Sequence, residues 1–125
     1  MKEPKDHTVA ILGASDKAGR FSNKAVRLLK RCGYRVIPVH PKLPEIEGLP
    51  VRANLDAIEE EVDTLTLYVE PLRSQALVES IASLKPRRVI FNPGTENPDL
   101  ESFLTAEGIP CVKACTLVML RTGQF

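Results

Sequence analysis

Hydrophobic residues along the chain fall into short β-branched runs that alternate with stretches of helical spacing. A buried strand of a parallel sheet is typically such a run, bounded by turn-forming residues. Five runs predict strands, namely residues 7–12 (HTVAIL), 35–39 (RVIPV), 64–71 (TLTLYVEP), 87–93 (RRVIFNP) and, more briefly, 109–114 (IPCVKA). Regular alternation of strands and helices predicts parallel β-α-β units with right-handed crossovers. We therefore expect an α/β fold with a doubly wound parallel sheet, three-layered and Rossmann-like, in one domain over residues 1–125.

The longest helical pattern lies in residues 21–34, where apolar residues recur on one face. Ser22 or Asn23 is a suitable N-cap for this helix, and Gly33 is a suitable stop. Cys32 falls on the apolar face, so we expect it in the core. The sequence also predicts an extended piece at residues 51–53 and a short helix near 56–60. Further helices are expected at residues 72–84 and, capped near Asn97, at 97–108. The tail, residues 115–125, is compatible with a helix or an extended segment.

Composition narrows the functional classes. The 125 residues are 43% hydrophobic and 26% charged, which is typical of a globular domain. A net charge of +1 gives no global field toward nucleic acid or an anionic membrane, so we expect neither as a partner. No apolar run approaches the roughly 18 residues that span a bilayer, and the first seven residues lack the apolar centre of a secretory signal. We therefore expect a cytoplasmic protein.

Cysteine and histidine usage argues against two kinds of site. The three cysteines are odd in number and have no C-x-x-C spacing, which does not predict a disulfide framework. The two histidines, His7 and His40, lie far apart, and no cluster has zinc-ligand spacing. We expect no metal site.

The first strand runs into a glycine-bearing turn, Gly13-Ala14-Ser15, which is followed by Lys17, Gly19 and Arg20. This spacing is not the G-x-G-x-x-G of a dinucleotide fingerprint. Gly13 lets the backbone approach a ligand, Ser15 offers a hydroxyl, and the next helix directs its N-terminal amides to the same place. The turn thus predicts a phosphate site. The alternative is a tight connection whose small residues serve the fold and whose basic residues are merely solvated.

The end of the second strand distinguishes between nucleotide ligands. A site for NAD usually carries Asp or Glu there, which holds the ribose hydroxyls. This strand ends instead in His40-Pro41-Lys42, with no acid and with one positive charge. A ligand with a phosphate on its adenosine ribose, CoA or NADP, fits better than NAD. The alternative for Lys42 is an exposed loop lysine.

Two later strand ends carry further candidates. Pro71, after Val69 and Glu70, can delay the next helix and leave backbone groups free for an adenine edge, although Pro also serves as a turn-former. Cys115 lies where a nucleophile could lie, but a small buried cysteine is the commoner explanation. The fourth strand is followed by a turn made of Asn92, Pro93 and Gly94, with Glu96 beyond it. Glu96 is an acid or base candidate or simply a charge at a helix N-terminus.

Taken in order, these residues resemble the small stand-alone CoA-binding protein family, which is similar to the N-terminal CoA-binding domain of the succinyl-CoA synthetase alpha subunit. The matching stretches span nearly the whole chain from Val9 and read VAILGASDKAGRFSNKAVRLL, GYRVIPVHPK, EGLPV, LTLYVEP, RVIFNPGTEN and ACTLVMLRTGQF. The resemblance implies three groups of ligand contacts: Gly13, Ala14, Ser15 and Lys17 at the pyrophosphate with Arg20 and Ser22 nearby; His40, Pro41 and Lys42 at the adenosine 3′-phosphate; and Val69, Glu70 and Pro71 at the adenine.

The resemblance also bears on catalysis. The synthetase domain has a glycine-richer first turn and works with a catalytic histidine supplied by other parts of its enzyme. The present sequence offers no second histidine-bearing loop, so we expect a non-catalytic protein that binds CoA or acyl-CoA. Its pantetheine arm would run toward Asn92, Pro93, Gly94 and Cys115. The alternatives are a small NADP-dependent oxidoreductase and a regulatory or interaction module without a ligand, and the sequence is compatible with a homodimer.

Overall fold

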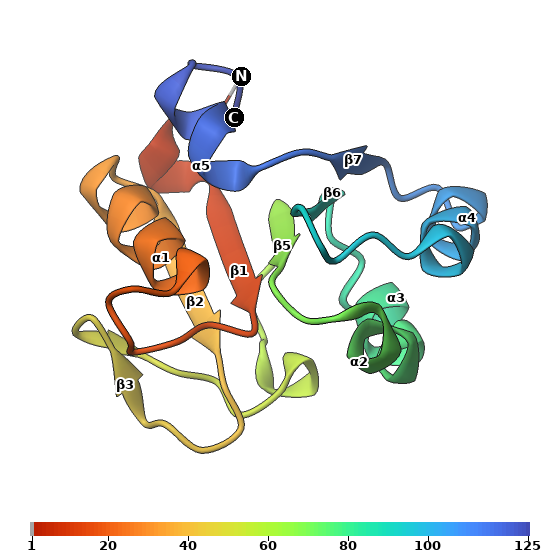
Figure 1. The fold of residues 1–125 in the computed structure, drawn as a ribbon, viewed down its shortest axis with the longest axis horizontal. Helices are drawn as coiled ribbons and strands as arrows, with labels where there is room; N and C mark the ends of the chain where they lie inside the picture. Colours follow the sequence, from red (N-terminus) through yellow and green to blue (C-terminus); the bar gives the residue numbers. More distant parts are fainter. Residues whose placement is uncertain (1) are drawn as a thin grey trace.

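A five-stranded parallel sheet forms the centre of the computed structural model, which describes residues 2–125 (Figure 1). The strand order is β2-β1-β5-β6-β7, and every neighbouring pair is parallel. This sheet, flanked by helices, confirms the predicted doubly wound, Rossmann-like α/β fold. The strands are β1 (Thr8–Leu12), β2 (Arg35–Val39), β5 (Thr64–Leu67), β6 (Arg88–Phe91) and β7 (Cys111–Lys113).

Helices cover both faces of the sheet, giving three layers. Figure 1 shows α1 and α5 together on one side and the other three helices on the opposite side. No helix among residues 2–125 is long and apolar enough to cross a membrane. The helices are α1 (Phe21–Arg31), α2 (Pro71–Ala76), α3 (Val78–Leu84), α4 (Pro98–Ala106) and α5 (Thr116–Arg121).

Strand β1, which lies between β2 and β5, illustrates why the chain folds into layers. All five of its residues are buried, and successive side chains point to opposite faces. Ala10 and Leu12 belong to the core beneath α3 and α4, whereas Val9 and Ile11 belong to the core beneath α1. A strand that is buried at every position therefore suits a sheet that is covered on both sides.

Some expected elements differ in the structure. The expectation for the N-cap of α1 is wrong: Arg20 occupies it without a side-chain hydrogen bond, and Ser22 and Asn23 lie inside the helix. Cys32 is exposed, so its expected core position is also wrong, because it is the residue at which the chain leaves the helix before Gly33. Asn97 caps α4 as expected, through its side chain and the Leu100 amide.

Two other predicted segments are divided or shortened. The helix expected at residues 72–84 is two helices, α2 and α3, which meet at Leu77. Pro71 does not delay α2 but is its first residue, a position that needs no amide hydrogen. The segment between β2 and β5 contains a small hairpin of β3 (Glu45–Ile46) and β4 (Leu49–Pro50), followed by a 3-10 turn, η2 (Leu55–Ala57). A second 3-10 turn, η1 (Pro4–Asp6), precedes β1.

The order of the strands fixes where a ligand can bind. The neighbouring strands β1 and β5 are followed by helices on opposite faces of the sheet, α1 after β1 and α2 and α3 after β5, so their connections leave the sheet in opposite directions (Figure 1). Such a reversal opens a crevice at the carboxyl ends of the strands. In this chain the crevice lies between the ends of β1 and β5, next to Gly13 and Tyr68.

Candidate functional site

A cavity of about 580 Å³ opens at the carboxyl ends of β1, β2 and β5, at the reversal of strand order. This location is where open α/β sheets bind their ligands. Eight of the sixteen predicted site residues line it: Gly13, Ala14, Ser15, Lys17, Arg20, His40, Pro41 and Val69.

Gly13 is required by a close approach of two backbone segments. Its φ is +88°, and a β-carbon at this position would lie 2.8 Å from the Tyr68 carbonyl oxygen and 2.8 Å from Val69 Cγ1. An L-residue would therefore be strained in its backbone and would collide with β5. The absence of a side chain keeps the wall of the cavity made of backbone at the point where β1 ends.

The loop after Gly13 is held by side chains of α1. Asn23, which is 0% exposed, donates from Nδ2 to the Ser15 carbonyl oxygen at 2.8 Å, and Arg27 Nη2 donates to the Ala18 carbonyl oxygen at 2.9 Å. Ser15 Oγ accepts from the Lys17 amide at 3.0 Å, so its own hydrogen is free to be donated. The amides of Ser15 and Asp16 have no hydrogen-bond partner within residues 2–125. The loop thus presents fixed, unused donors, which is the arrangement that binds a phosphate.

Charged side chains of both signs surround the cavity. Lys17, Arg20 and Arg73 are exposed cations of its lining, and Asp16 and Asp56 are exposed carboxylates. None of the five takes part in an ion pair within residues 2–125. The three cations are therefore available to an anionic ligand, and the two carboxylates limit the excess of positive charge to one.

Backbone amides next to His40 determine which of its ring nitrogens accepts a hydrogen bond and which is free to donate one. Its Nδ1 accepts from the amides of Lys42 and Leu43, both at 3.0 Å. In the neutral ring the proton therefore lies on Nε2. Because the half-buried His40 lines the cavity, it can offer Nε2–H to an anion there.

Eight predicted residues lie outside the cavity lining. Ser22 is buried inside α1, and Lys42 is exposed directly after Pro41. Glu70 and Pro71 begin the exposed start of α2. The remaining four lie at the carboxyl ends of β6 and β7, which are separated from β1 by β5: Asn92, Pro93, Gly94 and Cys115.

Asn92 holds elements together with every polar atom of its side chain. It donates to Thr66 Oγ1 at 2.6 Å and to the Leu67 carbonyl oxygen at 2.8 Å, and its Oδ1 accepts from the Thr116 amide at 2.9 Å. The hydroxyls of Thr66 and Thr116 also lie 2.8 Å apart. Asn92 therefore fixes the start of α5 above β5, and its side chain has no donor left for a ligand.

Tyr68 connects this buried network to the cavity. It lines the cavity, yet its hydroxyl group is buried and has no hydrogen-bond partner within residues 2–125. Burial raises the pKa of Tyr68 to about 12. The phenol is therefore neutral at physiological pH and cannot act as a base.

More than half of the residues that line the cavity were not predicted from the sequence. Asp16 was passed over inside the phosphate turn, and Tyr68 and Arg73 follow the third strand. The wall around η2 and α3 had no recognisable pattern in the sequence, because short polar loops and an exposed helix face resemble ordinary surface. This wall contains Ala53, Asn54, Leu55, Asp56, Leu77 and Ser80. The remaining unpredicted lining residues, Leu12 and Val39, are the last residues of β1 and β2.

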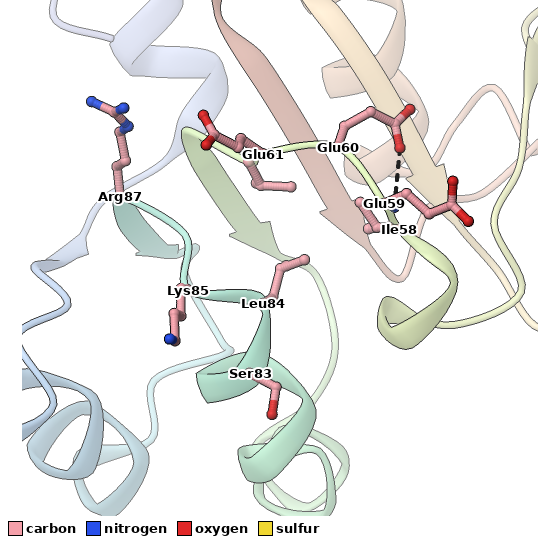
Figure 2. Close-up of a pocket in the computed structure, with 9 residues that line it drawn as sticks. Ile58, Glu59, Glu60, Glu61, Ser83, Leu84, Lys85 and Arg87 are labelled. Carbon is pink, nitrogen blue, oxygen red and sulfur yellow. Dashed lines mark hydrogen bonds between the residues drawn. The ribbon is translucent and has the colours of Figure 1, made fainter.

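A second hollow, of about 480 Å³, lies at the opposite edge of the sheet, before β5 and β6 (Figure 2). Figure 2 shows Glu59, Glu60 and Glu61 on one wall and Lys85 and Arg87 on the other. Glu60 is already bound through both oxygens by Arg52, at 2.8 and 2.6 Å. This hollow has no glycine turn and no helix N-terminus directed into it, so the cavity beside Gly13 is the candidate site.

Comparisons with known proteins identify a related family and related folds. The sequence model of a family described as "CoA binding domain" matches residues 7–121. A crystal structure of an uncharacterized protein superposes with a TM-score of 0.89 at 44% identity, covering 95% of this chain and 98% of that one. A second similar structure is the dinucleotide-forming acetyl-coenzyme A synthetase 1 of Ca. Korarchaeum cryptofilum, solved with phosphate and ADP. It superposes with a TM-score of 0.76 at 16% identity, over 89% of this chain and 26% of that one. At this identity the similarity shows a shared fold and nothing more.

One curated relative has been matched in sequence over a shorter stretch. The protein YneT of Bacillus subtilis (strain 168) is 28% identical over 60 residues, which are 48% of this chain and 44% of that protein. The matched stretch is thus less than half of either chain.

Proposed function

We propose, from the premise that this chain belongs to the CoA-binding domain family, that it binds coenzyme A or an acyl-CoA in the cavity beside Gly13 without catalysing a reaction. The observation that carries the proposal is a fixed loop, whose Ser15 and Asp16 amides are unused, beside the close approach of Gly13 to Tyr68 at the reversal of strand order. CoA carries a diphosphate and a ribose phosphate, and both need such donors.

The diphosphate would lie against the loop after β1. The amides of Ser15 and Asp16, the Ser15 hydroxyl and the cations of Lys17 and Arg20 are its partners. A β-carbon at position 13 would push β1 and β5 apart and alter the adjoining wall of the cavity, so the site fits a phosphate only with glycine there.

The ribose phosphate would lie at the end of β2. His40 offers Nε2–H there because its Nδ1 is occupied by the amides of Lys42 and Leu43. Lys42 is exposed next to this turn and adds a positive charge to its surroundings. The adenine would lie by Val69, on the β5 side of the cavity.

The placement of the reactive candidates supports a binding role without catalysis. Cys115 and Glu96, the nucleophile and the acid–base candidate of the sequence, both lie outside the cavity lining. Tyr68 does line it, but its pKa of about 12 keeps it protonated. A general base needs to be within hydrogen-bond reach of its proton, and a nucleophile needs a base beside it.

Isothermal titration calorimetry with CoA, dephospho-CoA and NADPH tests the proposal. We expect saturable binding of one CoA per chain and about tenfold weaker binding of dephospho-CoA, which lacks the ribose phosphate. The double variant Lys17→Gln/Arg20→Gln should lose at least tenfold in affinity, whereas Arg35→Gln, an exposed cation at the opposite edge of the sheet, should bind as the wild type does.

Three results would contradict the proposal. Tighter binding of NADPH than of CoA would favour an oxidoreductase. Heat from none of the three compounds would favour a module without a nucleotide ligand. Equal affinities of the Lys17→Gln/Arg20→Gln and wild-type proteins for CoA would place the ligand elsewhere.

A further inference from the structure

A shallow groove of about 290 Å³ runs between α1 and α5, which pack side by side on one face of the sheet (Figure 1). The residues that line it are Lys24, Arg27, Leu28, Arg31, Leu117 and Arg121. None of them lines the cavity beside Gly13, so the groove is a separate surface.

The groove is strongly and uniformly positive. Its lining contains four cations and no carboxylate, and none of the four forms an ion pair within residues 2–125. Neither α1 nor α5 contains Asp or Glu. The carboxylate of Glu47 contacts Asn23 at 3.1 Å, but Lys30 binds the Glu47 backbone, and neither residue lines the groove. A protein with a net charge of only +1 therefore concentrates unpaired positive charge here.

Apolar groups accompany the cations. Leu28 and Leu117 line the groove, Leu28 half-buried and Leu117 buried, and Val118, the next residue of α5, is 50% exposed outside that lining. Phe21, at the start of α1, is 68% exposed, with Lys24 Nζ 5.3 Å from its ring centroid. An apolar centre within a charged rim is the composition of a protein-binding groove rather than of an ordinary solvated helix face.

We propose that the groove between α1 and α5 binds an acidic amphipathic helix of a partner protein. Leucine-like side chains of that helix would lie against Leu28 and Leu117 and extend toward the exposed Val118, and its Asp or Glu residues would face Lys24, Arg31 and Arg121. Recognition of an amphipathic helix in a groove needs both an apolar centre and complementary charge at the rim, and this groove has both.

Other occupants match these features less well. A second copy docked symmetrically by the same face would bring four cations against four cations, which is repulsive. A nucleic acid backbone would use the cations but has no apolar face for Leu28 and Val118.

The groove also has a defined relation to the cavity. Arg20, the N-cap of α1, lines the cavity, and Lys24 to Arg31 of the same helix line the groove. A partner in the groove would therefore lie beside a ligand in the cavity, within the roughly 16 Å length of α1. The proposal rests on the groove itself and does not require that the ligand be CoA.

The probe for the test is a fluorescently labelled helical peptide with Leu at positions i, i+4 and i+7 and Glu on the flanking positions. Anisotropy should show saturable binding that weakens between about 0.05 M and about 0.3 M salt. We expect a matched peptide with Ser in place of Leu, and equal charge, to bind at least tenfold more weakly. The double variant Arg31→Glu/Arg121→Glu should also bind the probe at least tenfold more weakly, with the circular dichroism of the wild type.

Matched variants make the test specific. Arg35→Glu/Lys85→Glu carries the same change of charge on exposed residues elsewhere and should bind the probe as the wild type does. Val118→Glu, a substitution of one exposed apolar residue, should weaken binding independently of the arginines.

Several results would overturn the proposal. Equal binding of the Leu and Ser peptides would show attraction by charge alone. Binding of a single-stranded oligonucleotide or of phosphatidylserine vesicles, without binding of the peptide, would identify another class of partner. Sedimentation that shows self-association of the wild type, lost in Arg31→Glu/Arg121→Glu, would assign the groove to a second copy of the chain.

Discussion

Gly13 and Tyr68 approach each other so closely that a β-carbon on Gly13 would lie 2.8 Å from the Tyr68 carbonyl oxygen. This contact joins the ends of β1 and β5, the two strands between which the order of the sheet reverses. The glycine of the first turn therefore serves the fold and the cavity at once: it lets the strands pack, and it keeps the cavity wall free of a side chain.

The first prediction concerns this contact. Gly13→Ala should lower the free energy of unfolding by about 2–4 kcal/mol, because alanine is strained at a φ of +88° and its β-carbon collides with Tyr68 and Val69. Gly19→Ala is the matched control, since nothing lies within 4 Å of a β-carbon there; it should change stability by less than about 1 kcal/mol. Urea unfolding measures both, and equal stabilities of the two variants would contradict the role of Gly13.

The second prediction separates the two nitrogens of His40. In His40→Asn, the side-chain oxygen can replace Nδ1 as acceptor for the Lys42 and Leu43 amides, whereas the amide nitrogen takes the place of the ring Cδ2 and does not reach the position of Nε2. Stability should therefore stay near the wild-type value while CoA affinity falls about ten- to a hundredfold, the value of one hydrogen bond to a charged group. Thermal unfolding and calorimetric titration measure the two quantities. Unchanged affinity would remove His40 from the site.

The third prediction concerns the unpaired hydroxyl of Tyr68. Its removal in Tyr68→Phe leaves no other group without a partner, so the variant should be as stable as the wild type or more stable, by roughly 1 kcal/mol. The chain has two tyrosines, and an ultraviolet pH titration should show one that ionises near pH 12 and is absent in the variant. A large loss of stability in Tyr68→Phe would show that the hydroxyl has a partner after all.

The fourth prediction is a pH dependence at the Arg52–Glu60 pair. The hydrogen bond from Arg52 lowers the pKa of Glu60 from 4.5 to about 2. Because the folded-state pKa is the lower one, the stabilisation is present above pH 4.5 and is lost as the pH falls toward 2. The Glu60 side chain is 46% exposed, so the effect should be under about 1 kcal/mol. Arg52→Gln should therefore unfold at lower urea than the wild type at pH 7, and the difference should vanish near pH 2; a constant difference would contradict the assignment.

Much of the fold could be predicted from the sequence, because the buried strands are short runs rich in apolar and β-branched residues. Residues 35–39 form β2 as predicted, and β1 differs from its predicted range by one residue. The helix ends were less predictable. Asn23 has the side chain of an N-cap, yet it is buried inside α1, where it binds the carbonyl oxygen of Ser15. Tertiary contacts decide such cases, and they are not visible in local spacing.

The candidate site was predictable mainly where a turn follows β1 or β2; Val69, after β5, is the exception. Those turns carry glycine, proline and charge, and they supply most of the predicted residues that line the cavity. Asn92 looked equally suitable, but β5 separates its strand from β1, and its amide is used to fix α5. The η2 wall comes from a loop without regular periodicity, so only the folded chain shows that Asn54 and Asp56 face the cavity.

The most direct test of the central claim is a titration of isotope-labelled protein with CoA, followed by amide chemical shifts. If CoA binds in the cavity, the largest shifts should come from Gly13, Ser15, Lys17, His40 and Val69, and the amides of Lys85 and Arg87 at the opposite edge should stay in place. Shifts at Lys85 and Arg87 with none at Gly13 and Ser15, or no shifts at all at saturating CoA, would contradict the account.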